Sequence, residues 1–390
     1  MILSERRVRS AAARVQGATG DEQLARLIWS VVVEPGDGVA GALVAAFGAE
    51  EALRLAEEGL ADPAVVRAGL DGRSIAAARA RWEPRLDGAL ATAAAVRAAK
   101  AGLVLRTPGD DDWPSQLDDL GPHAPLALWV RGEPDALGLL DADRTWSAAI
   151  VGARAATPYG EHVAAELAAE LSAEGVAIVS GAAYGIDGAA HRAALGAGGL
   201  TVAVVAGGAD LVYPAGHARL FAEIARAGAV VSETPPGTTP TKWRFLARNR
   251  LIAALGGATV VVEAGARSGT LNTAGHAASL GRPLGAVPGP ITSTTSSGCH
   301  RLLREFDAQC ITGAGDVLEM LGAGPRTVTR PADPSPEEVR VRDALASRGA
   351  RALDEIVRRS GLAPRDAQAA LGLLELAGTV RRAEGGWLLA

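Results

Sequence analysis

A short basic segment carries the residues best suited to hold a charged polymer. The stretch TKWRFLARNRLIAALGG, from Thr241 to Gly257, has four cations and no acidic residue, and it includes the rings of Trp243 and Phe245. The cations are Lys242, Arg244, Arg248 and Arg250. Because cations follow phosphates and aromatic rings stack on unpaired bases, this combination is typical of proteins that bind single strands. The alternative is a solvated basic helix start whose rings pack into the core.

Three glycine-containing turns elsewhere in the chain have the composition of anion sites. Each follows an apolar run and leads into a helical pattern, and the free N–H groups at a helix start attract phosphate. The first turn holds Gly152, Arg154 and Thr157, the second holds Ser180 and Gly181, and the third holds Arg267, Ser268, Gly269 and Thr270. Three such turns beside the basic segment suit a chain of phosphates better than a single mononucleotide.

The second of these turns argues against a dinucleotide cofactor. The fingerprint GxGxxG is missing from the first turn, and the second strand ends in Ser180-Gly181, where a NAD-binding fold places the acid for its ribose. Asp187 and His191 lie four residues apart at a helix start, which suits either an acid–base pair or a cap with a local hydrogen bond. Since no nucleophile accompanies them, we favour the cap. We therefore expect no catalytic residues and no cofactor.

Six short apolar runs, separated by loops rich in glycine and proline, predict the elements that position these turns. The runs are WSAAIV, VAIVS, TVAVVA, AVVSE, ATVVVEA and PLGAVP. Continuous apolar strands are buried on both faces, so the pattern predicts a Rossmann-like α/β fold: a parallel sheet with helices on both faces. Ligands of such sheets bind at the carboxyl ends of the strands, which is where the turns lie.

Composition divides the chain into further regions. We expect a helical N-terminal domain over residues 1–100, the sheet domain over 101–322, a linker over 323–336 and a winged-helix domain over 337–390. The turn PGDGVAG, from Pro35 to Gly41, resembles a helix-hairpin-helix unit that presents N–H groups to a phosphate. A plain helical accessory domain is the favoured interpretation. A winged helix binds either DNA or protein, and the sequence favours neither.

Bulk composition excludes several classes of protein. The formal net charge is −5, so a nucleic-acid surface must be a local patch. Two cysteines, Cys299 and Cys310, supply neither a disulfide framework nor a metal site. No apolar stretch has the length of a signal peptide or a membrane span. We expect a cytoplasmic protein with reduced thiols, no metal and no membrane partner.

The ordered motifs resemble those of the DNA-processing protein A family, also called DprA or Smf. The motifs are GAR…T.YG, SG.A.GID..AH, GG.T.AV, a later YP, SE.P, F..RNRLIA.L, V.VEA…SGTL.TA..A..LGRP, AVPGP and GC. The chain departs from the family pattern at Ala182, where the family has leucine, at Leu246, where it has proline, and at His300, where it has asparagine.

The resemblance implies a protein that binds single-stranded DNA and hands it to the RecA recombinase during natural transformation. It also implies a homodimer formed through the Rossmann-like domain. Residue by residue, it implies that Arg154 and Lys242 bind the strand and that Phe245 contacts a base. The resemblance also implies that Arg248 and Arg250 lie beside Phe245, and that Gly152, Ser180 and Gly181 form the floor of the pocket.

Two other functions remain open at this point. Nucleotide-processing enzymes of the lysine-decarboxylase-like group share a related Rossmann core, with a PGGxGT loop and a catalytic acid. Here the turn reads SGTL, and Glu263 is the one nearby candidate acid, although hydrogen bonding to backbone N–H groups is its favoured role. The other possibility is a transcription regulator, in which the winged helix binds DNA and the central domain senses a ligand.

Overall fold

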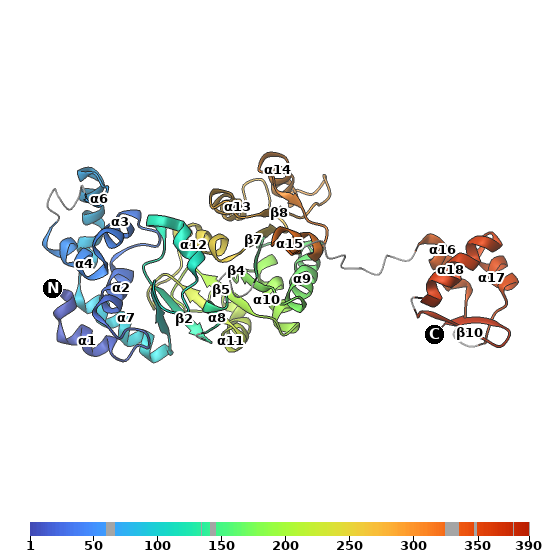
Figure 1. The fold of residues 1–390 in the computed structure, drawn as a ribbon, viewed down its shortest axis with the longest axis horizontal. Helices are drawn as coiled ribbons and strands as arrows, with labels where there is room; N and C mark the ends of the chain where they lie inside the picture. Colours follow the sequence, from blue (N-terminus) through green and yellow to red (C-terminus); the bar gives the residue numbers. More distant parts are fainter. Residues whose placement is uncertain are drawn as a thin grey trace. The chain divides into compact units, whose positions relative to one another are not determined.

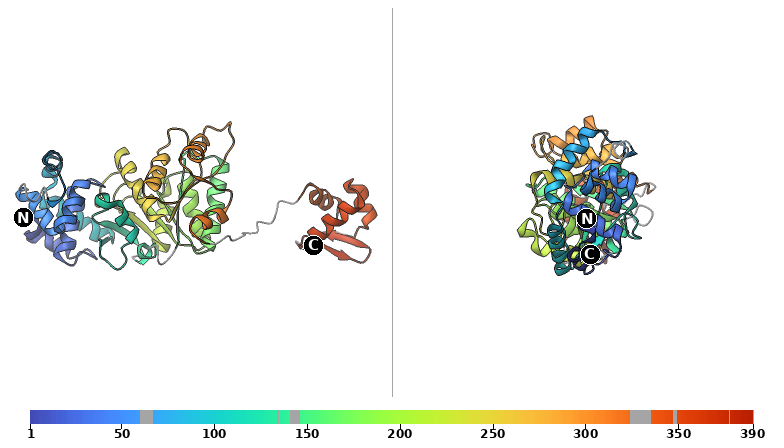
Figure 2. Two further views of the ribbon diagram at one scale, coloured as in Figure 1. Left: turned by 45° about the horizontal axis from the view of Figure 1, so that its top comes forward. Right: turned by 90° about the vertical axis from the view of Figure 1, so that its left-hand side faces the viewer.

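The computed structural model describes residues 1–59, 67–133, 135–140, 146–323, 335–346, 349–376 and 378–389. The chain forms two compact units, Met1–Arg326 and Thr327–Ala390 (Figures 1 and 2). Most of the linker expected over 323–336 lies outside the described residues. No helix in the described part of the chain is both long and apolar enough to cross a membrane.

A nine-stranded sheet runs through the described part of the first unit. Its strands are β1 (Val104–Arg106), β2 (Leu128–Gly132), β3 (Ser147–Val151), β4 (Ala177–Ser180), β5 (Thr201–Val205), β6 (Ala229–Ser232), β7 (Ala258–Val261), β8 (Leu284–Ala286) and β9 (Gln309–Cys310). The spatial order is β1-β2-β6-β5-β4-β3-β7-β8-β9. Strands β3 to β9 pair in parallel, which confirms the predicted parallel sheet. Strands β1 and β2 add an antiparallel edge that the apolar runs did not predict.

Helices cover both faces of the parallel sheet, as predicted (Figure 1). One face carries α12 (Lys242–Leu255), α13 (Thr270–Ser279) and α14 (Ser297–Glu305), and the other carries α9 (Pro158–Ala173), α10 (Ile186–Gly196) and α15 (Ala314–Met320). Successive residues of a strand point to opposite faces, so Ala149 and Val151 of β3 join the first layer while Ala148 and Ile150 join the second. Both layers are apolar, which explains the continuous apolar runs.

The strand order reverses at β3. From β3 the chain adds β4, β5 and β6 on one side, then crosses through α12 to β7 on the other side of β3. The loops that follow β3 and β7 therefore leave the sheet in opposite directions and open a crevice at its carboxyl edge. Ligands of open α/β sheets bind at such a reversal.

The N-terminal helices share a core with one edge of the sheet. They are η1 (Ile2–Ser4), α1 (Arg6–Ala12), α2 (Asp21–Val32), α3 (Gly38–Phe47), α4 (Ala49–Glu58), α6 (Gly72–Trp82), η2 (Glu83–Arg85) and α7 (Gly88–Ala101). The buried rings of Trp29 and Trp82 meet edge to face with centroids 5.3 Å apart. They belong to one apolar cluster with Trp129 of β2 and Phe221 of α11 (Ala218–Ala227). Shorter helices are η3 (Ser115–His123), α8 (Asp135–Gly138) and η4 (Ala215–His217).

The glycine turn between α2 and α3 is docked onto the sheet domain. The Asp37 carboxylate caps α3 by accepting from the N–H groups of Val39 and Ala40, and the Gly36 N–H donates to Glu233 at 3.0 Å. These N–H groups are therefore bonded within the protein. The arrangement favours the plain accessory role over a phosphate-binding hairpin.

The second unit is a winged helix with its own apolar core. Its helices are α16 (Pro336–Ala344), α17 (Leu353–Ser360) and α18 (Pro364–Leu376), followed by the antiparallel hairpin of β10 (Val380–Ala383) and β11 (Gly386–Leu389). Arg351, just before α17, pairs with Trp387 of the wing. This order of helix, turn, helix and wing confirms the predicted domain type.

Candidate nucleic-acid interface

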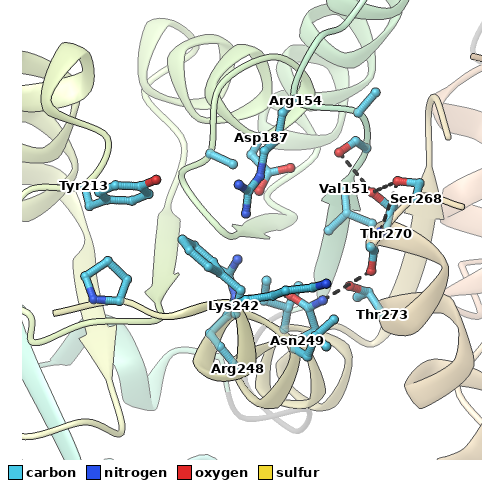
Figure 3. Close-up of a pocket in the computed structure, with 18 of the residues that line it drawn as sticks. Val151, Arg154, Asp187, Tyr213, Lys242, Arg248, Asn249, Ser268, Thr270 and Thr273 are labelled. Carbon is cyan, nitrogen blue, oxygen red and sulfur yellow. Dashed lines mark hydrogen bonds between the residues drawn. The ribbon is translucent and has the colours of Figure 1, made fainter. Parts of the chain in front are cut away.

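A cavity of about 610 Å³ opens at the strand reversal. Most of its lining comes from three segments: Val151 to Arg154 at the end of β3, Pro240 to Ile252 at the start of α12, and Ser268 to Thr273 at the start of α13. Ala183, Asp187 and Tyr213 complete it. Figure 3 shows these side chains entering from separate sides, with Arg154 and Asp187 opposite Lys242 and Asn249, and Ser268 and Thr270 to one side. The cavity thus lies where the sheet topology and the predicted turns both place a ligand.

Helix α12 presents an aromatic ring close to two guanidinium groups. The Phe245 ring lines the cavity, with the guanidinium carbon of Arg154 4.5 Å and that of Arg248 5.8 Å from its centroid. The Tyr213 ring lies 5.7 Å away at an interplanar angle of 51°. Such cation–π contacts orient the ring and place positive charge close to it. Helix α12 begins here because Thr241 caps it by accepting from the Arg244 N–H.

The guanidinium of Arg248 is buried in the wall of this cavity. Its Nη1 donates to the carbonyls of Gly181, at 2.9 Å, and Val204. Burial lowers the pKa of Arg248 to about 10, a shift that the Asp187 carboxylate opposes and Arg154 reinforces. Arg248 is therefore still charged at neutral pH. Gly181 is required beside it, because a Cβ there would lie 2.3 Å from Nη1.

The turn before α13 is open toward the cavity. Its hydroxyls form a short chain, in which Ser268 Oγ donates to Thr270 Oγ1 at 3.0 Å and Thr270 Oγ1 donates to the Gly152 carbonyl at 3.0 Å. Ser268 Oγ also accepts from the Thr270 N–H at 3.2 Å, and the N–H groups of Leu271 and Asn272 donate to the carbonyls of Ser268 and Gly269. No carboxylate among the described residues caps this helix start. The positive end of the helix therefore faces the cavity.

The turn before α9 is filled by one of the protein's own carboxylates. Glu263, which is buried, accepts from the Thr157 N–H at 2.9 Å and from Thr157 Oγ1 at 2.6 Å. Thr157 Oγ1 in turn accepts from the Gly160 N–H and caps the helix. The carboxylate thus takes the place that an anion would take at this helix start. This arrangement supports the backbone-bonding role favoured for Glu263.

The turn before α10 is filled in the same way by Asp187. This buried carboxylate accepts from the Gly181 N–H at 3.1 Å and also receives backbone hydrogen bonds from Ala183 and Gly152. Burial raises the pKa of Asp187, while Arg248 and these N–H groups act in the opposite direction. His191 bonds elsewhere, with Nδ1 2.7 Å from Thr201 Oγ1. The geometry thus favours the cap over an acid–base pair.

The structure brings together most of the residues expected to bind DNA. Eight of them line the cavity: Gly152, Arg154, Lys242, Phe245, Arg248, Ser268, Gly269 and Thr270. The others lie outside its lining. Ser180 is buried and donates to the Ile150 carbonyl, Arg250 is buried in an ion pair with Glu233 at 2.7 Å, and Arg267 is exposed. Thr157 and Gly181 shape the adjacent turns.

Two polar residues that line the cavity, Tyr213 and Asn249, are not predicted by the sequence analysis. A third, Asp187, is predicted there as a cap and not as part of the binding site. Asn249 Nδ2 lies 3.4 Å from the Gly269 carbonyl and 3.3 Å from Asn272 Oδ1, and so links α12 to the α13 turn. Both residues stand inside the motifs YP and RNR, so those motifs were the available signal.

The cavity has an excess of positive charge. Arg154, Lys242 and Arg248 line it, against the single acid Asp187. Among the described residues no group of three or more His, Cys, Asp or Glu side chains is arranged to hold a metal. The site can therefore bind anions through cations and helix N–H groups, and it can stack a planar ring on Phe245.

Comparison with known families gives the site its context. Residues 104–322 match the sequence model of the family described as DNA recombination-mediator protein A. The chain belongs to the DNA-processing protein A family. Residues 325–386 match the DprA winged helix domain, so both units have counterparts in DprA proteins.

Relatives and solved structures agree with this assignment. A putative DNA processing protein DprA of Mycobacterium tuberculosis is 49% identical over 305 residues, covering 74% of this chain and 77% of the relative. Protein Smf of Escherichia coli is 36% identical, covering 68% and 71%. The X-ray structure of Streptococcus pneumoniae DprA aligns with TM-score 0.61 and 32% identity, covering 77% of this chain and 98% of that one.

A second solved DprA is from Helicobacter pylori. It aligns with TM-score 0.50 and 30% identity, covering 57% of this chain and 97% of that one. Its study concerns the single-stranded DNA binding mode of the H. pylori protein. This chain is thus similar to a DprA for which a mode of strand binding has been described.

Proposed function

We propose that this DprA-family protein binds single-stranded DNA in the cavity at the strand reversal. The observation that carries the proposal is the Phe245 ring, which lies beside Arg154 and Arg248 in a cavity with excess positive charge. An unpaired base stacks on such a ring whatever its sequence. Lys242 and the positive end of the α13 dipole then attract the adjacent phosphates.

We further propose that the protein hands the strand to the RecA recombinase, as in DNA uptake and natural transformation. This part rests on membership of the family, as do a homodimer formed through the Rossmann-like domain and a cytoplasmic location. RecA filament assembly on strands coated with single-strand-binding protein measures the loading step. The sedimentation coefficient in analytical ultracentrifugation distinguishes a homodimer from a monomer. A protein that binds DNA but does not accelerate filament assembly would contradict the loading role.

A non-catalytic role also fits the acids of the site. Glu263 is held by Thr157 and by Thr295 Oγ1 at 3.2 Å, and Asp187 is held by backbone N–H groups. Neither carboxylate is free to act on a nucleotide bond, so the geometry does not favour the nucleotide-processing alternative. Incubation with nucleoside monophosphates tests this directly, and release of free base would overturn it.

Fluorescence anisotropy with oligothymidylate and with duplex DNA tests strand binding. We expect the single strand to bind more tightly, and Phe245→Ala to weaken binding about 10-fold, since stacking contributes about 1–3 kcal/mol per base. Lys242→Ala should weaken it several-fold and reduce the slope of log affinity against log salt by about 0.7. Arg73→Ala on α6 removes an exposed charge that does not line the cavity and serves as the control. Unchanged binding in both site variants would refute the assignment.

A further inference from the structure

A second cavity lies where the N-terminal helices meet the loop between β6 and α12. Its volume is about 280 Å³. One wall comes from the end of α2 and from η2 and α7, and the other comes from residues 234–238 of the loop. Arg244, in the first turn of α12, also lines it. The cavity therefore joins the helical region to the helix that carries Lys242 and Phe245.

Positive charge exceeds negative charge in this second cavity. Arg85, Arg97 and Arg244 line it against the single acid Glu34. The Arg244 guanidinium contacts both Glu34 oxygens, at 2.8 and 2.9 Å, and Arg85 also binds this carboxylate. Burial tends to raise the pKa of Glu34, but these two arginines outweigh it and hold the pKa below its ordinary value. Glu34 is therefore ionised and neutralises one of the three cations.

Arg97 is the cation that remains available to a ligand. Its side chain is exposed and forms no ion pair with any described residue. It lies against the loop at Gly237, where a Cβ would be 2.8 Å from the guanidinium carbon. The nearby acid, Asp210, is engaged with the Gly237 N–H at 2.8 Å. The loop thus positions the Arg97 guanidinium, and the N–H groups of that guanidinium stay available to a ligand.

The wall beside Arg97 is apolar. Leu90, on the same helix, is 44% exposed although its side chain is large and hydrophobic, and it lines the cavity together with Pro235 and Pro236. An apolar wall next to an unpaired cation can cover the base or sugar of a nucleotide while the cation pairs with its phosphate.

The two cavities are continuous along the chain. Thr238 lines the second cavity and Pro240 the first, and two residues of extended chain span at most about 7 Å. Arg244 and Phe245 are neighbours on α12 and line one cavity each, and Arg244 Nη1 fixes the loop between them by donating to the Thr239 carbonyl at 2.8 Å. A strand that leaves the first cavity over this loop meets the second one next.

We propose that the second cavity binds a further nucleotide of the same DNA strand, with its phosphate on Arg97 and its base or sugar against Leu90 and Pro235. This proposal rests on the proposed strand binding in the first cavity. It makes the N-terminal helices part of the DNA footprint. Binding should therefore strengthen with strand length in a manner that depends on Arg97.

The test compares the affinities of the full-length protein for oligothymidylates of about 4 and about 12 nucleotides, within the usual range of site sizes. For wild type we expect a large gain in affinity between the two lengths. Arg97→Ala and Leu90→Ser should each reduce that gain about 3- to 10-fold, Arg97→Glu should reduce it further, and Arg97→Lys should restore most of it. Arg97→Ala should also lower the salt slope for the long strand by about 0.7. Arg73→Ala is again the charge control.

The outcomes separate this proposal from the one on which it rests. If wild type binds and Phe245→Ala weakens binding, but Arg97→Ala and Leu90→Ser keep the full gain with length, the second site is refuted while the first stands. If Phe245→Ala has no effect, the proposed function itself fails. Thermal melts of each variant identify any loss of affinity that reflects unfolding.

Discussion

The imidazole of His191 shows how a polar residue of the site region serves the fold. Thr201 Oγ1 donates its only hydrogen to the Ile178 carbonyl at 2.8 Å, so His191 Nδ1 must carry the proton of the 2.7 Å contact with Thr201. Nε2 is then a buried acceptor with no partner among the described residues. Burial, reinforced by the charges of His217 and Arg192, lowers the pKa of His191 to about 3.

We predict that this histidine makes the protein less stable in mild acid. Its folded pKa lies below its unfolded value of about 6.5, so the unfolded state binds the extra proton as the pH falls. The contribution of neutral His191 to the free energy of unfolding is complete above pH 6.5 and is lost as the pH falls toward 3. By pH 4.5 the loss is about 2–3 kcal/mol. Urea unfolding against pH measures it, with His191→Gln as the comparison. A variant whose stability falls as steeply as that of wild type over this range would contradict the assignment.

Arg250 illustrates a cation that sequence alone assigns to the wrong environment. It shares the basic segment with Lys242, yet its guanidinium turns away to Glu233, the His123 carbonyl and the Ala247 carbonyl. A basic run on a helix distributes its side chains over several faces, so the composition of the run does not show which cations meet the ligand.

We predict opposite outcomes for two variants of this helix. Arg250→Met breaks a buried ion pair and should lower the free energy of unfolding by about 3–5 kcal/mol, while the affinity of the folded protein for single strands stays within about 2-fold. Lys242→Met should weaken binding several-fold and leave stability within about 0.5 kcal/mol, because Lys242 is exposed. Urea unfolding and anisotropy on the same samples measure both. A large loss of affinity in Arg250→Met, measured under conditions where the variant is still folded, would show that Arg250 contacts the DNA.

At the scale of elements, the helix starts around the site are not equivalent. The α9 start is closed by the Glu263 carboxylate and the α10 turn by the Asp187 carboxylate, whereas the α13 start is capped by the neutral Ser268 hydroxyl. The sequence predicts all three turns because each combines glycine with a following helical pattern. It does not predict which are occupied, because Glu263 lies 106 residues from Thr157 along the chain.

We predict that Glu263 stabilises the fold rather than the complex. Glu263→Gln should lower the free energy of unfolding by about 1–3 kcal/mol, because it removes charge from a buried helix start and leaves one N–H or O–H less well paired. Glu161→Gln, in the exposed first turn of the same helix, should cost less than about 1 kcal/mol. Guanidinium unfolding distinguishes them, and equal stabilities would show that the carboxylate at this helix start is unimportant.

The sequence likewise predicts some of the strands and not others. The six apolar runs become β3 to β8 because burial on both faces leaves a continuous signal. Strands β1 and β2 carry Arg106 and Arg131 and pair at an edge, so their short runs lack that signal. The cavity was predictable as a location at the carboxyl edge of the sheet. Its outline was not, since Tyr213 reaches it from the loop after β5, which holds no cation.

At the scale of the whole molecule, each unit has its own core. The winged helix is built around Val341, Ile356, Leu371 and Trp387, while the first unit contains both cavities and the sheet. Since all proposed DNA contacts come from one unit, strand binding does not require the other.

We predict that a chain ending at Ala323 keeps its affinity for single-stranded DNA within about 2-fold of the full-length value, because none of the residues lining the two cavities is removed. The first unit should also unfold at the same temperature in the shortened chain as in the intact protein. Anisotropy and calorimetry on the two lengths measure these effects. A collapse of binding on truncation would assign the DNA contacts to the winged helix, as in a ligand-sensing transcription regulator.

The carboxylates that close two of the three turns also bear on competition by small anions. A free nucleotide that enters the cavity meets one helix start without a carboxylate, one ring and a few cations, and it makes no contacts beyond these. A polymer that enters the same cavity continues to the next contact along the loop, so its binding energy grows with length. Because the Glu263 and Asp187 carboxylates occupy two of the three turns, a mononucleotide or inorganic phosphate has no anion site in those turns. We therefore expect metabolites that share the phosphate chemistry of DNA to compete weakly with a strand for this cavity.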